Sequence, residues 1–144
     1  MTTKEKLLSL NACSEAVEWA GDKTIKEIWD TCHRGDWMLW LFVRTNKTED
    51  DFRLLTLTKG HCANTVRRLM KDPRSTNAVD VAIKFGEGTA TREELNAAYA
   101  AAAAYAAYAA AGAAYAAYAA DAARKSNQQL TADICRKYLP IPNF

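Results

Sequence analysis

The stretch AAYAAAAAYAAYAAAGAAYAAYAADAA, residues 97 to 123, governs the interpretation of this chain, because it is built almost wholly from alanine. Alanine is the strongest helix former, since its side chain has no rotamer freedom to lose. Just before the stretch, Thr91 is followed three residues later by Glu94, which is the pattern of a capping box at a helix start. The sequence therefore predicts one long helix over residues 91–125.

Tyrosines interrupt the alanines and give this helix a face of its own. The segment 103–112 is nearly repeated by 113–122, a period of ten residues, which is almost three helical turns. Bare alanine allows close approach of another helix, while each tyrosine has a large apolar body with one polar tip. A packed seam, a partner-binding surface and a homodimer contact are the alternatives for this face. Its candidate binding residues are Tyr105, Tyr108, Tyr115 and Tyr118.

The other segments also show helical periodicity, and none alternates convincingly as a strand. We expect an all-α fold: a single domain over residues 1–144 with six to seven helices, of which the alanine/tyrosine-rich one is the longest. Shorter helices occupy residues 1–90, and a C-terminal helix spans residues 127–139, with Leu130 facing inward. The shorter helices are expected over 4–10, 13–20, 25–32 (capped by Thr24), 37–44 (capped by Asp36), 52–71 and up to Phe85 (capped by Ser75 or Thr76).

Composition places the chain among ordinary globular domains, with 144 residues, 49% hydrophobic and 25% charged. A net charge of +2 gives no argument for nucleic acid or a membrane surface as partner. The first residues lack the apolar run of a signal peptide, and alanine is too weakly apolar to favour a membrane span. We therefore expect a soluble, cytoplasmic protein whose cysteines are reduced.

Cysteine and histidine supply the most tempting chemical site, because Cys32-His33 and His61-Cys62 are adjacent pairs and Cys13 and Cys135 stand elsewhere in the chain. Adjacent helical residues point about 100° apart, so both members of such a pair rarely bind one zinc ion. No C-x-x-C pair, Ser-His-Asp order, phosphate loop or paired-carboxylate motif occurs in the sequence. We expect buried thiols, no metal, no cofactor and no enzymatic activity.

Tryptophan and arginine provide the remaining candidate binding residues. Trp29 and Trp37 are expected in the core, whereas Trp40 is a candidate for a pocket or an interface. Two loose basic clusters are either solvated faces near helix ends or an anion site for a phosphate-bearing ligand. The candidate binding residues of the first cluster are Arg67, Arg68 and Arg74, and the second cluster holds Arg124, Lys125, Arg136 and Lys137.

Three patches follow one another along nearly the whole chain. They are Cys13-x2-Ala16-Val17-x-Trp19 with Trp29-x2-Cys32-x4-Trp37-Met38-x-Trp40-Leu41; Asp72-Pro73-Arg74-Ser75-x-Asn77-Ala78 with Ala82-x2-Phe85-x2-Gly88-x-Ala90-Thr91-x-Glu93-Glu94-Leu95; and 133–139. In this order they resemble the Imm-5-like family of immunity proteins, found in bacterial and phage genomes. The resemblance implies a non-enzymatic inhibitor that neutralises a protein toxin by stoichiometric binding.

A second hypothesis follows from the absence of catalytic motifs beside aromatic and basic residues. The chain is then a phage counter-defence protein that sequesters a small nucleotide immune signal. This hypothesis predicts a pocket between helices lined by arginine and an aromatic ring. The two hypotheses therefore name different partners, a protein toxin or a small phosphate-bearing signal.

Overall fold

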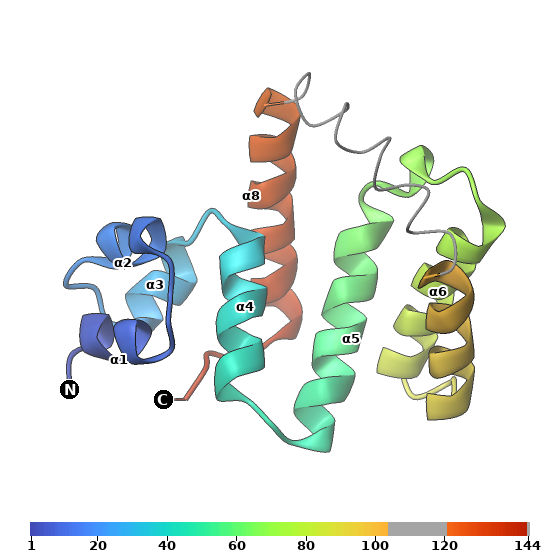
Figure 1. Cartoon of the computed structure of the whole chain (residues 1–144), viewed down its shortest axis with the longest axis horizontal. Coiled ribbons are helices and arrows are strands. Elements are labelled where there is room, and N and C mark those ends of the chain that lie inside the picture. Colours follow the sequence, from blue (N-terminus) through green and yellow to red (C-terminus); the bar gives the residue numbers. More distant parts are fainter. Residues whose placement is uncertain (104–120, 144) are drawn as a thin grey trace.

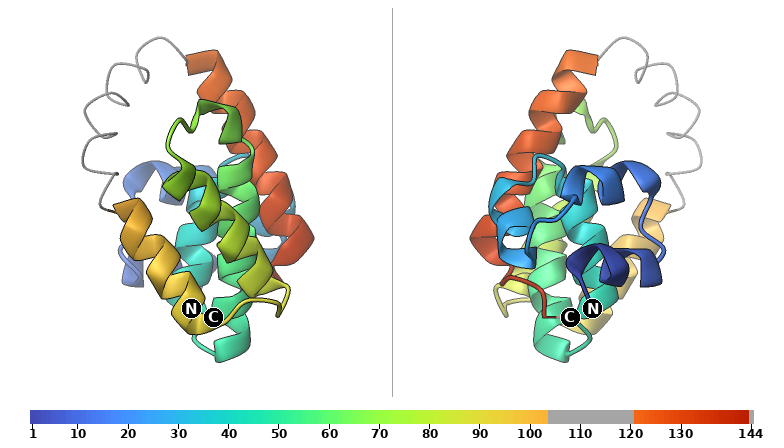
Figure 2. Two further views of the ribbon diagram at one scale, coloured as in Figure 1. Left: turned by 90° about the vertical axis from the view of Figure 1, so that its right-hand side faces the viewer. Right: turned by 90° about the vertical axis from the view of Figure 1, so that its left-hand side faces the viewer.

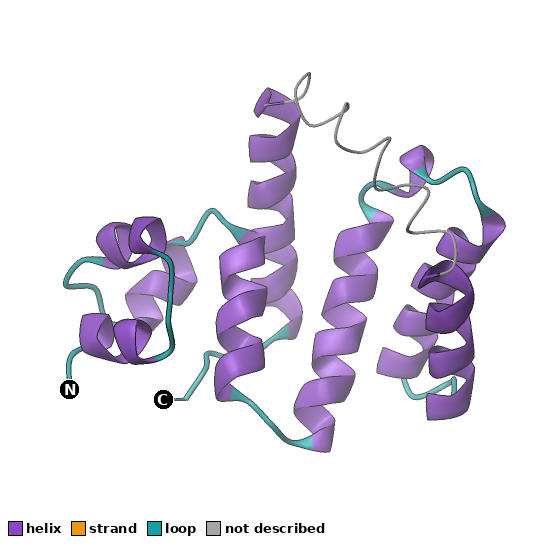
Figure 3. Ribbon diagram, viewed as in Figure 1, coloured by secondary structure: helices purple, strands orange, loops and turns teal. Residues whose placement is uncertain are grey.

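The structure, a computed structural model, describes residues 1–103 and 121–143. Every regular element in these two ranges is helical, and neither range contains a strand (Figure 3). The predicted all-α class is therefore confirmed. In chain order the elements are α1 (Thr3–Ser9), α2 (Ser14–Ala20), α3 (Ile25–Thr31), α4 (Gly35–Thr45), α5 (Glu49–Asn64), the 3-10 turn η1 (Arg67–Leu69), α6 (Pro73–Gly86), a helix over 92–103, and α8 (Asp121–Tyr138).

The longer helices stand side by side, with the short ones gathered at one flank (Figure 1). Helix α4 packs against α8, and α5 packs against both α8 and α6. The three short helices α1–α3 lie on the side of α4 that faces away from α5. The two chain ends lie close together at the lower end of this view, whereas α8 begins at the upper end (Figures 1 and 2).

Two hydrophobic clusters meet at α4. The first joins α3, α4, α8 and the segment that follows α8, and consists of Trp29, Cys32, Met38, Phe42, Ala132, Cys135 and Leu139. The second joins α1–α3 to α4, and consists of Leu7, Val17, Ala20, Ile28 and Leu41. Helix α4 contributes buried side chains to both clusters, so it connects the N-terminal helices to the rest of the molecule.

Two threonine caps named from the sequence, at Thr24 and Thr91, are confirmed, whereas the capping box of Thr48 and Asp51 at the start of α5 was missed. The Thr24 side chain accepts the amide of Glu27, and the Glu27 carboxylate accepts the amide of Thr24. The amide of Glu94 donates to Thr91 Oγ1 at 3.1 Å, so the predicted cap of the helix over 92–103 is confirmed. Such short-range reciprocal bonds depend on local sequence alone, which is why the sequence reveals them.

Three other helix boundaries were predicted wrongly. Asp36 lies inside the first turn of α4, because Arg34 holds the cap position and Gly35 is the first helical residue. Helix α6 begins at Pro73 with Asp72 as its cap, rather than at Ser75 or Thr76, since proline fits the first turn of a helix. The helix predicted over 52–71 runs instead over Glu49–Asn64 and is followed by η1.

The predicted long helix over 91–125 is described at its two ends only. Residues 92–103 lie beside α6, whereas residues 121–125 belong to α8 on the far side of α5 (Figures 1 and 2). These two described segments are not collinear, so they are not parts of one straight rod. The candidate residues Tyr105, Tyr108, Tyr115 and Tyr118 lie outside the described residues.

The predicted boundary between two helices at 125–127 is also wrong, because α8 continues through these residues. Asn127 is accommodated there since its side-chain amide donates to Thr65 Oγ1 at 2.8 Å instead of competing for its own helix backbone. Leu130 was expected to face inward, yet it is 48% exposed, and Ala132 and Cys135 are residues of α8 that are fully buried. Within the described ranges, every helix is too short or too polar to traverse a lipid bilayer.

The contact between α4 and α8 is tightest at Gly35. A Cβ added to Gly35 would collide with the Thr131 hydroxyl oxygen and would lie 2.7 Å from the backbone nitrogen of Ala132. The carbonyl of Gly35 also accepts a weak hydrogen bond from the Cys135 thiol, with a sulfur–oxygen distance of 3.7 Å. Glycine at this position therefore brings the two backbones into direct contact.

We expect Gly35→Ala to lower the free energy of unfolding by about 1–3 kcal/mol, because overpacking against a helix backbone cannot relax by side-chain rotation. Urea denaturation followed by circular dichroism measures the change. Gly60→Ala is the comparison and should cost less, since its added Cβ would lie 2.9 Å from Ile83 Cγ1 and 3.3 Å from the nearest backbone atom, against 2.7 Å at Gly35. Unchanged stability of the Gly35 variant would contradict the close contact.

Candidate functional site

All four tryptophans of the chain line one chamber between the N-terminal helices and α4. The chamber has a volume of about 310 Å³, and apolar side chains of α1–α4 form most of its surface. Trp29 is buried at its back, whereas the other three indole rings are partly exposed. Its polar lining comes from Asn11, Cys13 and Asp36. We call this space the tryptophan chamber.

A helix-ending motif sets one wall of the tryptophan chamber. The backbone N–H of Asn11 donates to the Leu8 carbonyl at 2.9 Å, and the backbone N–H of Ala12 donates to the Leu7 carbonyl at 3.0 Å. This is the Schellman pattern, which requires a left-handed residue after the helix. Asn11 has a φ of 61°, and asparagine tolerates this conformation better than most residues. The motif directs the chain from α1 into α2 along the chamber.

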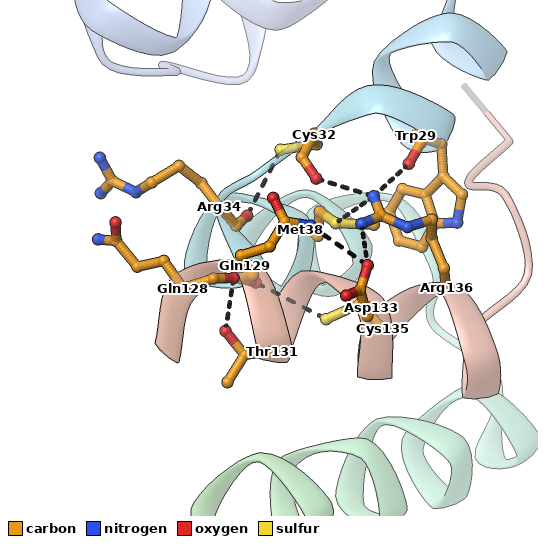
Figure 4. A network of polar contacts seen from close by, with 11 residues as sticks. Trp29, Cys32, Arg34, Met38, Gln128, Gln129, Thr131, Asp133, Cys135 and Arg136 are labelled. Carbon is orange, nitrogen blue, oxygen red and sulfur yellow. Dashed lines mark hydrogen bonds and ion pairs between the residues drawn. The ribbon is translucent and has the colours of Figure 1, made fainter. Parts of the chain in front are cut away.

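Arg136 on α8 holds the C-terminal end of α3 in place (Figure 4). Its Nη1 atom donates to the carbonyl oxygens of Trp29 at 3.0 Å and Cys32 at 2.8 Å, which lie at the C-terminal end of α3. Its Nη2 atom donates to Asp133 at 2.7 Å. The last carbonyls of a helix lack partners within the helix, so this guanidinium satisfies them from another element. The α3–α4 connection is thereby anchored on α8.

A second, polar hollow opens beside this connection. It has a volume of about 590 Å³ and lies between α2, the α3–α4 connection and the first turns of α8. Figure 4 shows the side chains of Arg34 and Gln128 extending on the same side, away from the Arg136 contacts. We call it the basic hollow, and its lining residues are Glu15, His33, Arg34, Arg124, Lys125, Gln128 and Gln129.

One layer of side chains separates the tryptophan chamber from the basic hollow. The imidazole of His33, in the hollow, contacts Trp19 and Trp37, in the chamber, with ring centroids 5.7 and 6.1 Å apart. The guanidinium of Arg34 lies 4.4 Å from the centroid of the Trp37 ring. The two spaces are therefore neighbours that share a wall of aromatic and cationic groups.

Arg34 is held in this wall by carboxylates on both sides. Its Nε and Nη2 atoms donate to Asp36 at 2.9 and 2.7 Å, and its Nη1 atom lies 3.7 Å from Glu15. The hydrogen bonds from Arg34 hold the pKa of Asp36 below its ordinary value, and the same pairing raises the pKa of Arg34. A bidentate pair of this kind fixes the orientation of the guanidinium plane.

Two of the four cysteines are shielded from solvent. Cys32 and Cys135 are buried, as expected, whereas Cys13 is exposed and Cys62 is half-buried. Burial raises the pKa of Cys32, and a hydrogen bond with Cys62 together with burial raises that of Cys135, so both thiols stay protonated. Across 1–103 and 121–143, no three histidine, cysteine or acidic side chains converge on a possible metal position.

The sequence-predicted binding residues are not brought together. Arg67 forms a bidentate pair with Asp80 at 2.6 and 3.0 Å, Arg68 donates to a backbone carbonyl, and Arg74 pairs with Asp72. These three arginines lie on η1 and α6, whereas Trp40 lies on α4. Of the predicted set within the described residues, only Trp40 lines the tryptophan chamber.

Sequence reasoning missed His33 and Arg34 as site residues and placed Trp37 in the core, although it is only partly buried. A usable signal was present, because His33 and Arg34 lie between Trp29 and Trp37 in the most tryptophan-rich part of the chain. Arg124 and Lys125 were noted as a basic pair, but nothing local indicates that they face Arg34.

Comparison of this chain with protein-family models, with curated proteins and with solved structures yields no match.

Replacing Arg136 tests the anchor of the α3–α4 connection. Arg136→Ala leaves two carbonyls of α3 without their donor, so we expect a loss of about 1–3 kcal/mol in the free energy of unfolding. Arg136→Lys should also destabilise, since a single ammonium cannot reproduce the fork of the guanidinium. Urea denaturation measures both, with the exposed Lys137→Ala as control. Equal stabilities of all three variants would rule the anchor out.

The Arg34–Asp36 pair makes stability depend on pH. Because the pKa of Asp36 is below its ordinary value of 3.8 in the folded chain, its stabilising effect is complete above that value and is lost as pH falls through the folded pKa. We expect Asp36→Asn to lower the urea midpoint at pH 7 and to match the parent chain near the acid limit. In an Arg34→Ala background the substitution should have no such pH-dependent effect.

Proposed function

We propose that this protein acts by stoichiometric binding rather than catalysis, and that its ligand is a small phosphate-bearing signal held in the basic hollow. The observation that carries the proposal is the lining of that hollow, where three cationic side chains and one carboxylate surround a space of about 590 Å³. Arg34 already pairs with Asp36, so we place the phosphate against Arg124 and Lys125. An arginine fork matches two phosphate oxygens at once. The volume lies within the range of about 300–1,000 Å³ that is usual for small-ligand sites.

The setting of the basic hollow supports binding over reaction. Its titratable groups are one carboxylate, one imidazole and three cations, without a nucleophile paired to a base. Arg34 is already oriented by Asp36, so it loses little further freedom when it meets an anion. The amides of Gln128 and Gln129 add neutral donors and acceptors at the same rim. These features suit retention of an intact ligand.

This proposal favours the nucleotide-sequestering hypothesis over the toxin-immunity one. A hollow between helices, lined by arginine and bordered by aromatic rings, is what that hypothesis requires. The toxin-inhibitor alternative rests on the resemblance to the Imm-5-like family and on tyrosines outside the described residues. The host or phage setting of the signal is part of the proposal and rests on the same resemblance.

Titration calorimetry with pyrophosphate, AMP, GMP and cyclic di-GMP tests the proposal directly. We expect at least one of these probes to bind with a stoichiometry near one per chain, and more weakly as salt is raised. After heat denaturation of the complex, chromatography should recover the probe unchanged. Absence of binding by all four at about 1 mM, or recovery of a cleaved product, would overturn it.

Charge reversal identifies the binding surface. Each of Arg124→Glu and Lys125→Glu should weaken binding at least about tenfold, since a charge-assisted hydrogen bond contributes roughly 1.5–3 kcal/mol. Arg68→Glu is the matched control, because Arg68 is an exposed arginine in η1, outside the hollow. Equal losses in the control and the hollow variants would show a non-specific charge effect and contradict the assignment.

A further inference from the structure

We infer that the tryptophan chamber is a nucleobase site, so that the ligand is a nucleotide whose phosphate lies in the basic hollow and whose base enters the chamber. This inference rests on the proposed function, because it takes the phosphate position from it. It adds a second binding site and the chemical class of the group that fills it.

The two spaces are neighbours on either side of one wall. Arg34 contacts both sides of this wall, since it lines the basic hollow and stacks on Trp37 at 4.4 Å. His33 does the same, with ring centroids 5.7 Å from Trp19 and 6.1 Å from Trp37. A ligand that reaches over this wall into both spaces is best matched by an anionic group on the side of the hollow and an uncharged ring on the side of the chamber.

The lining of the chamber indicates what the uncharged group is. The chamber, of about 310 Å³, is lined by four indole rings, which have flat π faces. Nucleobases of every kind stack on such faces, because each base is itself a flat aromatic ring. Asn11 adds a polar side chain to a mainly apolar lining, whereas the Asp36 carboxylate already accepts hydrogen bonds from Arg34. A base has polar atoms at its edge that can hydrogen-bond with Asn11, and an acyl chain has none.

Partial exposure of the rings is a further argument. Trp19, Trp37 and Trp40 remain partly exposed around the chamber, although the same helices bury smaller side chains completely. Small-ligand sites are commonly apolar hollows lined by aromatic rings. The cation on Trp40 is Arg44, at 5.4 Å, so this ring lies at a part of the lining that does not depend on Arg34.

Fluorescence titration separates the two sites, because every tryptophan of the chain lines the chamber. The probes are AMP, GMP and UMP. Ribose 5-phosphate is the matched probe that lacks a base, and octyl phosphate is the probe that carries an alkyl chain instead of a nucleoside. We expect at least one nucleoside monophosphate to quench the emission and to bind at least about tenfold more tightly than ribose 5-phosphate.

Three tryptophan variants locate the base. Trp40→Leu should reduce the preference for the base to about twofold while the affinity for ribose 5-phosphate is unchanged, because the cation on Trp40 is Arg44 and not Arg34. Trp37→Leu should also reduce the preference, and Trp37→Phe should retain it. Phe52→Leu is the control, since Phe52 packs on Phe85 at 5.8 Å in the α5–α6 contact. If Trp37→Leu fails to fold, Trp40→Leu gives the result independently of Arg34.

The outcomes distinguish the inference from the proposed function. Equal affinity for ribose 5-phosphate and all nucleoside monophosphates overturns the base site and leaves phosphate binding in place. Tighter binding of octyl phosphate overturns it in favour of an acyl ligand. Failure of every probe, pyrophosphate included, overturns the proposed function and the inference together.

Discussion

The close contact of α4 with α8 at Gly35 is the constraint on which the remaining arrangement depends. Without a side chain at this position, the first turn of α4 rests directly on the backbone of Ala132. Arg136, one helical turn further along α8, binds the last carbonyls of α3. Together they attach the α3–α4 connection to α8, which positions His33 and Arg34 beside Arg124 and Lys125. The basic hollow is therefore formed by the packing of α4 and the end of α3 against α8.

Local sequence accounts well for what is decided within a few residues. The threonine caps at Thr24 and Thr91, the all-α class and the burial of Trp29 follow from propensity, capping and hydrophobic pattern. The start of α4 cannot be derived in this way. An aspartate such as Asp36 is equally common as the cap of a helix and as an acidic residue in its first turn. The contact that decides between these roles comes from α8, about a hundred residues later in the chain.

The candidate site was less predictable than the fold for the same reason. Trp40 was identified because tryptophan is a common interface anchor, and the structure adds Arg44 at 5.4 Å from its ring. The local sequence does not reveal that Arg34 lies beside Arg124 and Lys125, because this proximity depends on how α8 packs against α4. Arg67, Arg68 and Arg74 form an equally basic cluster in the sequence, and the structure pairs Arg67 with Asp80 and Arg74 with Asp72, just as it pairs Arg34 with Asp36. Composition alone does not separate the two clusters.

The position of the chain ends has a practical consequence. Both ends lie together at the end of the molecule opposite to the start of α8, and Arg124 and Lys125 belong to the first turns of that helix (Figure 1). A tag or a surface linker attached at either chain end therefore leaves the side of the basic hollow formed by Arg124 and Lys125 facing the solution. Immobilised protein on a sensor chip would keep that side open to dissolved small molecules.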